Sequence, residues 1–215
     1  MPSSTDAPLK PADAGKPSKG EQTAQRILDA AEQAFAERGF EATSLREIAG
    51  RVGIREPGLY NHFASKRDIY AAVLERGLSP LLEAMQTHLD GEDALQAYAR
   101  LPEMMTDLLA EHPAMAALFQ QALQGGAESS GQQLMREWLD RLFSRAIEIL
   151  HDMGYEQVAA EDLAIQTIAM FNLCTGYFLS QRAFEVMAEG SIAAPENLER
   201  QKKLLRKLQR AVLLG

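Results

Sequence analysis

Apolar residues recur at spacings of three and four along most of the chain, which is the pattern of amphipathic helices. The first such stripe consists of Ala24, Ile27, Leu28, Ala31 and Phe35. We expect it to form a helix that starts at Thr23 and stops at Gly39, because a glycine after a periodic run ends a helix. No segment alternates apolar and polar residues as a half-buried strand would, so the pattern predicts an all-α fold.

Two short helices are predicted next. Ser44 and Glu47 have the spacing of a capping box, in which the serine accepts a backbone N–H and the glutamate reaches back. The helix that they open should end at Gly53, since glycine tolerates the left-handed conformation found at helix C-termini. Pro57 suits the first turn of a second helix that runs to about Phe63. Two such helices around a glycine-containing turn form a helix-turn-helix, which can place its second helix in a major groove of DNA.

The rest of the chain continues the helical pattern. Ser65 and Asp68 predict another capped helix start. Further helices are expected over residues 78–89, 92–111, 114–123, 132–153, 161–189 and 195–215. The domain organisation that follows is a disordered N-terminal arm over residues 1–20, a helix-turn-helix DNA-binding domain over 21–78 and a C-terminal domain over 79–215.

Charge and cysteine content narrow the classes of function. The formal net charge of −8 disfavours DNA binding by the chain as a whole, but the acidic excess lies in residues 79–195, whereas acidic and basic residues balance in 1–78. A DNA partner should therefore meet the N-terminal third. Cys174 is the single cysteine, which excludes an intramolecular disulfide and a cysteine-based zinc cluster. No secretory signal is apparent, so we expect a cytoplasmic protein.

The helix-turn-helix segment resembles the DNA-binding domain of the tetracycline-repressor (TetR-like) transcriptional regulators. The residues that carry the resemblance are Ile48-Ala49, Val52-Gly53-Ile54 and Leu59-Tyr60-Asn61-His62-Phe63-Ala64-Ser65-Lys66. The resemblance implies an all-α homodimer with a variable C-terminal domain, which binds a small molecule and thereby releases the DNA. It also implies that Tyr60, His62 and Lys66 contact the DNA backbone and that residues 46, 55, 56 and 61 read bases.

The predicted DNA-binding residues lie around the two short helices. They are Ser44, Arg46, Arg55, Glu56, Gly58, Tyr60, Asn61, His62 and Lys66. Arginine can reach a guanine and lysine can meet a phosphate, especially beside the N-terminus of a helix. The chain departs from the family pattern at Arg55, where a serine or threonine usually caps the second helix, and Gly58 lowers helix propensity there. We therefore expect a weakly capped recognition helix.

The C-terminal domain is rich in methionine and aromatic residues, which favours an adaptable apolar pocket. The predicted ligand-binding residues are Met104, Met105, Leu108, Phe119, Trp138, Met170, Phe171, Asn172, Thr175, Tyr177 and Phe178. Residues 163–181 carry no charge, but their polar side chains argue against a membrane and favour a buried helix at a subunit contact. We expect the last two helices to form a homodimer.

The function predicted from the sequence is a ligand-responsive regulator of transcription. It would be a repressor that binds a pseudo-palindromic operator as a homodimer and leaves it when a small apolar or aromatic effector binds. We expect no enzymatic activity, no cofactor and no metal, because Glu148 and His151 form a lone Glu-x-x-His pair where a di-iron site needs two. Two alternatives are a DNA-binding protein without an effector, and an all-α binding protein or enzyme with a vestigial DNA-binding domain.

Overall fold

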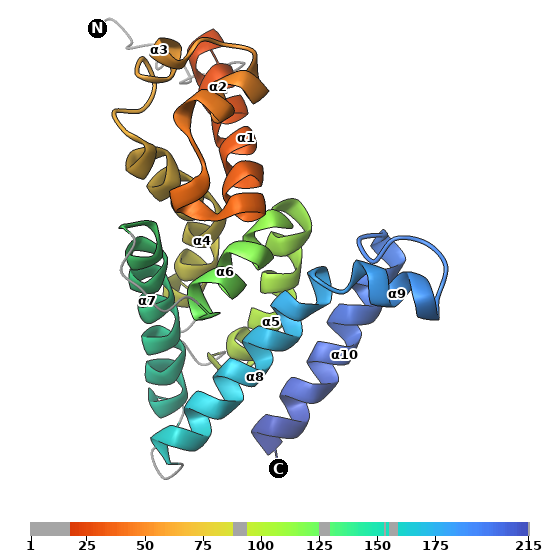
Figure 1. The fold of residues 1–215 in the computed structure, drawn as a ribbon. Coiled ribbons are helices and arrows are strands. Elements are labelled where there is room, and N and C mark those ends of the chain that lie inside the picture. The colour runs from red at the N-terminus through yellow and green to blue at the C-terminus, as the bar shows by residue number, and fades with distance from the viewer. Residues whose placement is uncertain (1–17, 88–93, 125–129, 153, 155–158, 215) are drawn as a thin grey trace, which may run out of the picture.

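A computed structural model describes residues 18–87, 94–124, 130–152, 154 and 159–214. These residues form helices and no strand, which confirms the all-α prediction (Figure 1). The helices are α1 Lys19–Ala42, α2 Leu45–Val52, α3 Glu56–Leu59, α4 Lys66–Thr87, α5 Ala94–Glu111, α6 Ala114–Gln124, α7 Ser130–Asp152, α8 Ala160–Phe178, α9 Gln181–Met187 and α10 Pro195–Leu214. Most of the predicted N-terminal arm, residues 1–17, lies outside the described residues.

Helix α1 begins four residues earlier than its apolar stripe predicted. Ser18 and Glu21 form a capping box: the Glu21 N–H donates to Ser18 Oγ at 3.2 Å and the Ser18 N–H donates to Glu21 Oε2 at 2.7 Å. Gly39 interrupts the helix with a φ of 80°, as its position in the sequence predicted, and the last residues bend towards α2.

Helices α2 and α3 form the predicted helix-turn-helix. The Glu47 N–H donates to the Ser44 hydroxyl at 3.1 Å at the start of α2, and Gly53 ends α2 with a φ of 77°. Arg55 occupies the N-cap of α3 without a side-chain hydrogen bond, as expected from the sequence. Helix α3 is shorter than predicted, because it ends at Leu59 and the chain continues to Phe63 in turns.

The N-terminal helices enclose an aromatic core. Phe35, Phe40 and Tyr70 pack against one another with ring centroids 5.0–5.7 Å apart. Ile48 from α2 and Leu59 from α3 are almost completely buried against this group. We refer to α1–α3 and the first turns of α4 as the head, and to the remaining helices as the body.

Helix α4 is continuous from the head into the body and contains Gly77 and Pro80, whereas the sequence analysis expected a separate helix over residues 78–89. Tertiary packing explains the difference. Leu78 and Leu81 are buried between helices, and a side chain at Gly77 would lie 3.0 Å from the Met115 methyl carbon. The glycine thus permits close approach of two helices, and burial of the flanking leucines offsets the hydrogen bond that Pro80 cannot make.

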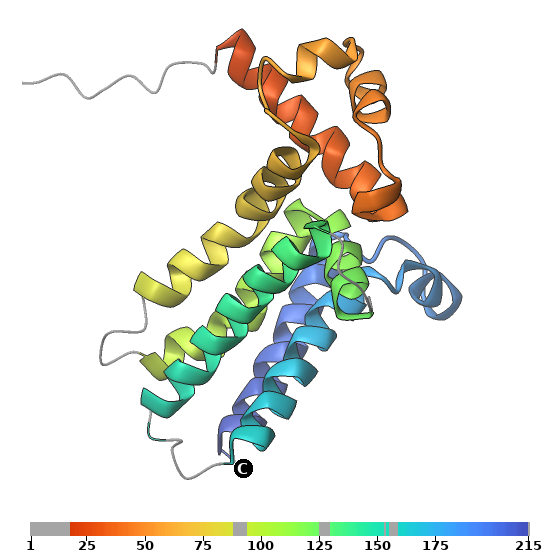
Figure 2. The ribbon, with the colours of Figure 1, turned by 60° about the vertical axis from the view of Figure 1, so that its left-hand side comes forward.

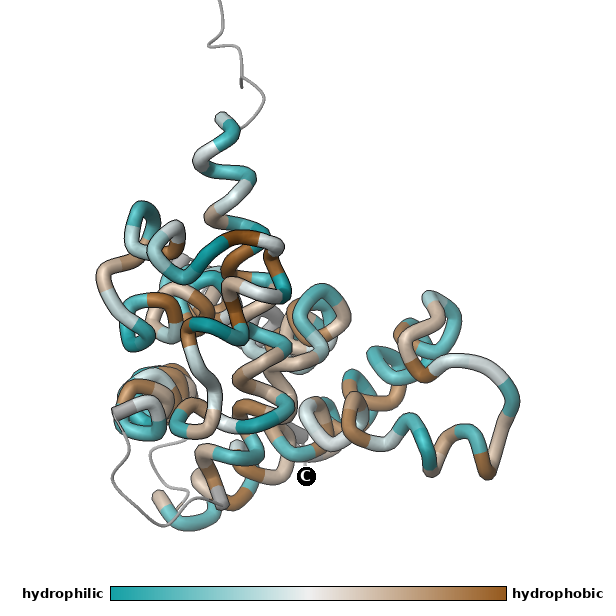
Figure 3. The backbone as a smooth tube through the Cα atoms, turned by 45° about the horizontal axis from the view of Figure 1, so that its top comes forward, coloured by the Kyte–Doolittle hydropathy of each residue, from teal (hydrophilic) through white to brown (hydrophobic). Residues whose placement is uncertain are grey.

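The body places α8 and α10 side by side, with α5 packed against both (Figures 1 and 2). The single helix predicted over 161–189 is wrong: the chain breaks after Phe178, and α9 turns away from α8 by 71°. Figure 3 shows α9 and its neighbouring loop standing away from the other helices. By length and hydropathy no single helix could cross a membrane among the described residues; only the bent pair α8 and α9 would pass such a test together.

Candidate DNA interface and effector cavity

The outer end of the head presents polar side chains to solvent. Arg46 on α2, Arg55 before α3 and Asn61 after it are all exposed, and the Tyr60 ring is 54% exposed. Figure 1 shows α2 and α3 together at one end of the molecule, far from α10. The chain brings these residues of the predicted DNA-binding set onto one surface.

Several other cations of the head are held by the protein itself. Arg51 forms ion pairs with Glu37 and Glu47, and Arg26 donates to the Val52 carbonyl. Arg51 also holds the pKa of the Glu37 carboxyl below its ordinary value through their hydrogen bond. Arg46 and Arg55 have no intramolecular partner within the described part of the chain. Arg46 and Arg55 are therefore available to a partner at the outer end of the head.

The remaining predicted DNA-binding residues are less exposed. Glu56, Gly58 and His62 are half-buried, and the Ser44 hydroxyl caps α2. Gly58 packs against Ile54, where an added Cβ would make an ordinary contact at 3.7 Å. The backbone at this position does not require glycine, so the sequence weakens α3 without a local steric reason.

Lys66 has partners other than the predicted phosphate. Its ammonium donates to the carbonyls of Phe40, Glu41 and Thr43 at 2.8–3.2 Å and lies 4.4 Å from the centre of the Phe40 ring. An ammonium has three N–H donors, and these carbonyls occupy all of them. In this conformation Lys66 joins the start of α4 to the segment that connects α1 and α2.

A charged cluster that sequence reasoning missed joins the head to the body. Glu32 on α1 is almost completely buried; its carboxylate accepts from Arg76 at 2.6 Å and lies 3.1 Å from His112 Nδ1. Arg76 also pairs with the exposed Asp29 at 2.6 Å. Nearby, the Gln121 amide on α6 donates to the Ala36 carbonyl at 2.8 Å. We call Asp29, Glu32, Arg76 and His112 the joint cluster.

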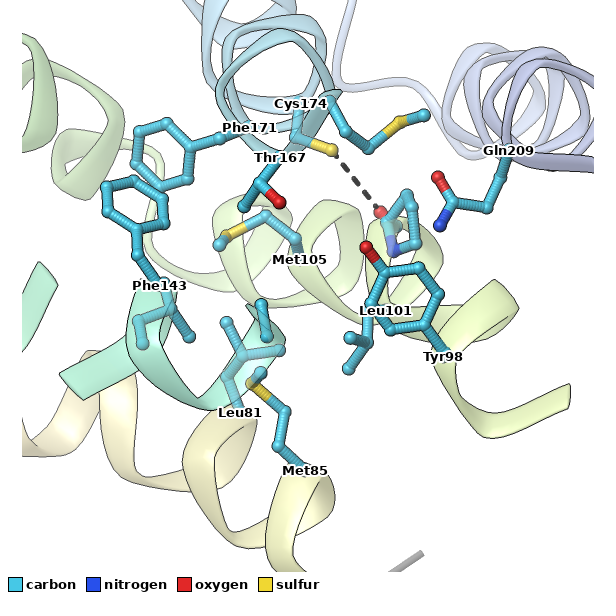
Figure 4. A pocket seen from close by; sticks show the side chains of 14 residues that line it. Leu81, Met85, Tyr98, Leu101, Met105, Phe143, Thr167, Phe171, Cys174 and Gln209 are labelled. Atoms are coloured by element: carbon cyan, nitrogen blue, oxygen red, sulfur yellow. Dashed lines mark hydrogen bonds between the residues drawn. The ribbon is translucent and has the colours of Figure 1, made fainter. Parts of the chain in front are cut away.

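The body contains a cavity of about 70 Å³ between α4, α5, α7, α8 and α10 (Figure 4). Most of its lining is apolar, and none of the described lining residues carries a charge. The lining residues are Leu81, Met85, Tyr98, Leu101, Pro102, Met105, Leu142, Phe143, Ala146, Thr167, Met170, Phe171, Cys174 and Gln209. We call this space the effector cavity.

Comparison with known proteins identifies the head. The sequence pattern described as "Bacterial regulatory proteins, tetR family" matches residues 27–73, which span most of α1, the helix-turn-helix and the start of α4. The head therefore resembles the N-terminal domain of TetR-family regulators.

Two relatives of this chain are named as regulators of transcription. It is 40% identical over 76 residues to the HTH-type transcriptional activator FasR of Mycolicibacterium smegmatis, covering 34% of this chain and 35% of FasR. It is 36% identical over 110 residues to the HTH-type transcriptional repressor KstR2 of Rhodococcus jostii, covering 49% of this chain and 52% of KstR2. The aligned part thus spans about a third to a half of these relatives.

The fold extends the likeness over the body. The solved structure of the transcriptional regulator FadR from Bacillus subtilis, in complex with stearoyl-CoA, superposes with a TM-score of 0.58 at 19% identity. The match covers 84% of this chain and 96% of that one. It shows that the chain shares the helical fold of that structure, body included.

The structure divides the predicted ligand-binding residues among several places. Met105, Met170 and Phe171 line the effector cavity. Met104 and Leu108 line a separate hollow beside Arg76 and His112 of the joint cluster. Because helix α5 presents different faces to these two hollows, Met104 and Met105 lie in different sites although they are adjacent in sequence.

The other predicted ligand-binding residues lie outside the effector cavity. Phe119 is buried against Phe171, with ring centroids 5.3 Å apart. Asn172 and Tyr177 line a groove between α8 and α10. The last three are placed by their neighbours: Thr175 bonds the Phe171 carbonyl, Phe178 packs on Tyr177, and Trp138 lies under the Arg141 guanidinium.

Sequence reasoning missed several residues of the cavity, including Met85, Tyr98, Thr167 and Gln209. Gln209 is only 4% exposed although it is polar. A signal existed in the sequence, since Gln201, Leu205 and Gln209 recur at spacings of four along α10 and therefore share one face.

The outer face of α8, α9 and α10 is apolar and exposed. Ile165, Leu173 and Leu204 are each about half exposed, and Val186 and Met187 on α9 are almost fully exposed. Exposed apolar side chains that gather on one face mark a surface for association. The face is formed by the helices predicted to pair in a dimer.

Proposed function

We propose that this protein is a ligand-responsive transcriptional regulator of the TetR family that binds DNA. In the form we favour, it is a repressor that binds a pseudo-palindromic operator as a homodimer and is released by a small apolar or aromatic effector. One observation carries the proposal. Arg46 and Arg55, which have no partner among the described residues, lie with the exposed Tyr60 and Asn61 on or next to α2 and α3, whereas Arg51 and Arg26 of the head are paired.

The roles of these residues follow from their chemistry. The Arg46 and Arg55 guanidinium groups and the Asn61 amide can make bidentate contacts to base edges, whereas Tyr60, His62 and Ser44 are suited to phosphates. Glu56 can accept from a cytosine amine. Lys66 acts on DNA binding through position, because it orients α4 against the α1–α2 connection.

Dimer formation through α8 and α10 supports the operator geometry. Two recognition helices must reach successive major grooves, and a two-fold axis through the apolar face would present them as a symmetric pair. Burial of the half-exposed leucines on that face, Leu173 and Leu204, supplies the hydrophobic driving force.

Release by an effector is a shift between two states of the dimer. The effector cavity touches α4 through Leu81 and Met85, and α4 continues into the head. A ligand that displaces these side chains changes the angle of α4. The joint cluster passes that change to α1, since Arg76 on α4 holds Glu32.

Selection of bound sites from random DNA tests the proposal. The wild-type protein should enrich a palindrome with two half-sites about one helical turn apart. Arg55→Ala and Asn61→Ala should relax the preference at individual base positions, at a cost of about 1–3 kcal/mol each. Tyr60→Ala should weaken all sequences alike.

Arg136→Ala is the control, because Arg136 is an exposed arginine on α7 in the body. It should leave both the motif and the affinity unchanged. Failure to enrich any sequence, or equal losses in Arg55→Ala and Arg136→Ala, would contradict a DNA interface at the end of the head.

A further inference from the structure

The effector cavity contains a buried hydroxyl group that the protein does not satisfy. Thr167 Oγ1 is inaccessible to solvent and has no hydrogen-bond partner among the described residues. Two other buried threonines bond the carbonyl four residues earlier in their own helix: Thr106 donates to Pro102 at 2.8 Å and Thr175 to Phe171 at 3.0 Å. Thr167 sits on α8, the same helix as Thr175, and makes no such bond. An unpaired buried hydroxyl is costly, and a ligand oxygen would remove that cost.

The surroundings of Thr167 limit what that ligand can be. Figure 4 shows its hydroxyl directed into the space beside Met105, with the Gln209 amide entering from α10. The Cys174 thiol donates to the Pro102 carbonyl, and burial raises the pKa of Cys174 to about 12, so it stays neutral. With no cation in the described lining, a carboxylate or phosphate would lose its hydration without gaining an ion pair.

We propose that the effector is an uncharged, largely apolar molecule with one oxygen that accepts a hydrogen bond from the Thr167 hydroxyl. The inference rests on the proposed function and specifies the chemical class of its effector. The cavity of about 70 Å³ is smaller than the ~150 Å³ space that admits benzene in an engineered core. The ligand therefore enters by displacing the flexible side chains of Met85, Met105 and Met170.

Three small molecules of nearly one shape can test this chemistry. Acetophenone carries a neutral carbonyl, α-methylstyrene replaces that oxygen with a methylene, and benzoate carries a charge. Dissociation constants come from titration of the full chain, followed by the methionine methyl resonances in NMR spectra. Acetophenone should bind about five- to tenfold more tightly than α-methylstyrene, which is the effect of one neutral hydrogen bond. Benzoate should shift no methionine resonance.

A matched pair of variants locates the interaction. Thr167→Val keeps the shape of the side chain and removes the hydroxyl, so acetophenone should lose its advantage while α-methylstyrene binds as before. Thr175→Val is the control, because that hydroxyl already donates within α8 and does not line the cavity. It should preserve the ratio of the two dissociation constants. Thermal melting verifies that both variants fold.

The result separates this inference from the proposed function. Three results would overturn the inference. The first is the same ratio of acetophenone to α-methylstyrene dissociation constants in Thr167→Val and wild type. The others are binding of benzoate as tight as that of acetophenone, and no binding of any of the three molecules. DNA binding is measured on its own, without these molecules, in the site selection described above. The proposed DNA interface can thus stand while the effector chemistry fails, and the reverse.

Discussion

The polar groups at the outer end of the head and those in the effector cavity of the body differ in both charge and exposure. At the head, Arg46 and Arg55 are charged, exposed and free of intramolecular partners, which suits a polyanion that arrives with its own charge. In the cavity, Thr167 and Gln209 are neutral and enclosed by apolar side chains, which suits an uncharged ligand. In the joint cluster between them, Glu32 and Arg76 are charged and largely buried at once, so this pair should be the most sensitive of the three regions to mutation.

Removal of Glu32 should have the largest effect on stability. Glu32→Ala leaves the partly buried Arg76 with only its exposed partners, Asp29 and Gln25, and we expect a loss of about 2–3 kcal/mol in the free energy of unfolding. Asp29→Ala removes a carboxylate from the same arginine, but the Asp29 side chain is 68% exposed, so the loss should stay below about 1 kcal/mol.

Urea denaturation measures both variants of the joint cluster. Equal losses would mean that Glu32 gains nothing from its burial. The coupling between the effector cavity and the head is measured separately, as the fall in DNA affinity that acetophenone causes. In a Glu32→Ala protein that still folds, that fall should be smaller than in Asp29→Ala.

A charge on the apolar face should separate the subunits. Leu204→Glu places a carboxylate near the two-fold axis of the proposed dimer, where it loses hydration in both subunits, and we expect dimerisation to weaken by about 2 kcal/mol or more. Leu123→Glu is the control, since Leu123 on α6 is exposed to a similar extent away from that face. Sedimentation at several concentrations reports the dissociation constant. A monomeric wild type, or an unchanged constant in Leu204→Glu, would exclude this face as the interface.

The contrast between exposed and buried groups within the head should also appear in the pH dependence of the free energy of unfolding. Burial raises the pKa of the Tyr70 phenol in the folded protein above its ordinary value of 10.0. Its stabilising contribution is therefore complete below pH 10 and is lost as pH rises, because the unfolded chain ionises first. The unfolding free energy should fall by about 1.4 kcal/mol per pH unit for this group.

Tyr70→Phe should flatten that alkaline decline in stability. Tyr60→Phe removes an exposed phenol of the head and serves as the matched control. Denaturation curves between pH 9 and 11 distinguish the two variants. The same slope in both would show that Tyr70 is not the group that titrates.

Local signals predicted the head well, because its structure depends on residues close together in sequence. The Ser44 cap, Gly53 and the run from Leu59 to Lys66 each act within one turn or one loop. The same reasoning placed Arg55 correctly as an N-cap without a side-chain bond. The length of α3 and the partners of Lys66 were not predictable in this way, since Lys66 bonds carbonyls more than twenty residues earlier.

The body was harder to predict because its features depend on packing between distant helices. Pro80 is a local helix breaker, yet buried neighbours on both sides keep α4 continuous. The break between α8 and α9 has no proline or glycine to mark it. The cavity is lined by side chains from five helices. Composition identifies methionine-rich stretches, but it does not tell on which face of a helix each side chain lies.

Because α4 is one continuous helix, a small movement at the cavity becomes a larger displacement at the head. From Leu81, at the cavity, to Lys66, at the head, the helix rises about 22 Å at 1.5 Å per residue. A tilt of about 6° at the inner end would carry the far end sideways by about 2 Å. In the proposed release from DNA, a ligand that moves the methionine side chains a short way apart would displace the head by this amount, and the arginines would no longer fit the two grooves.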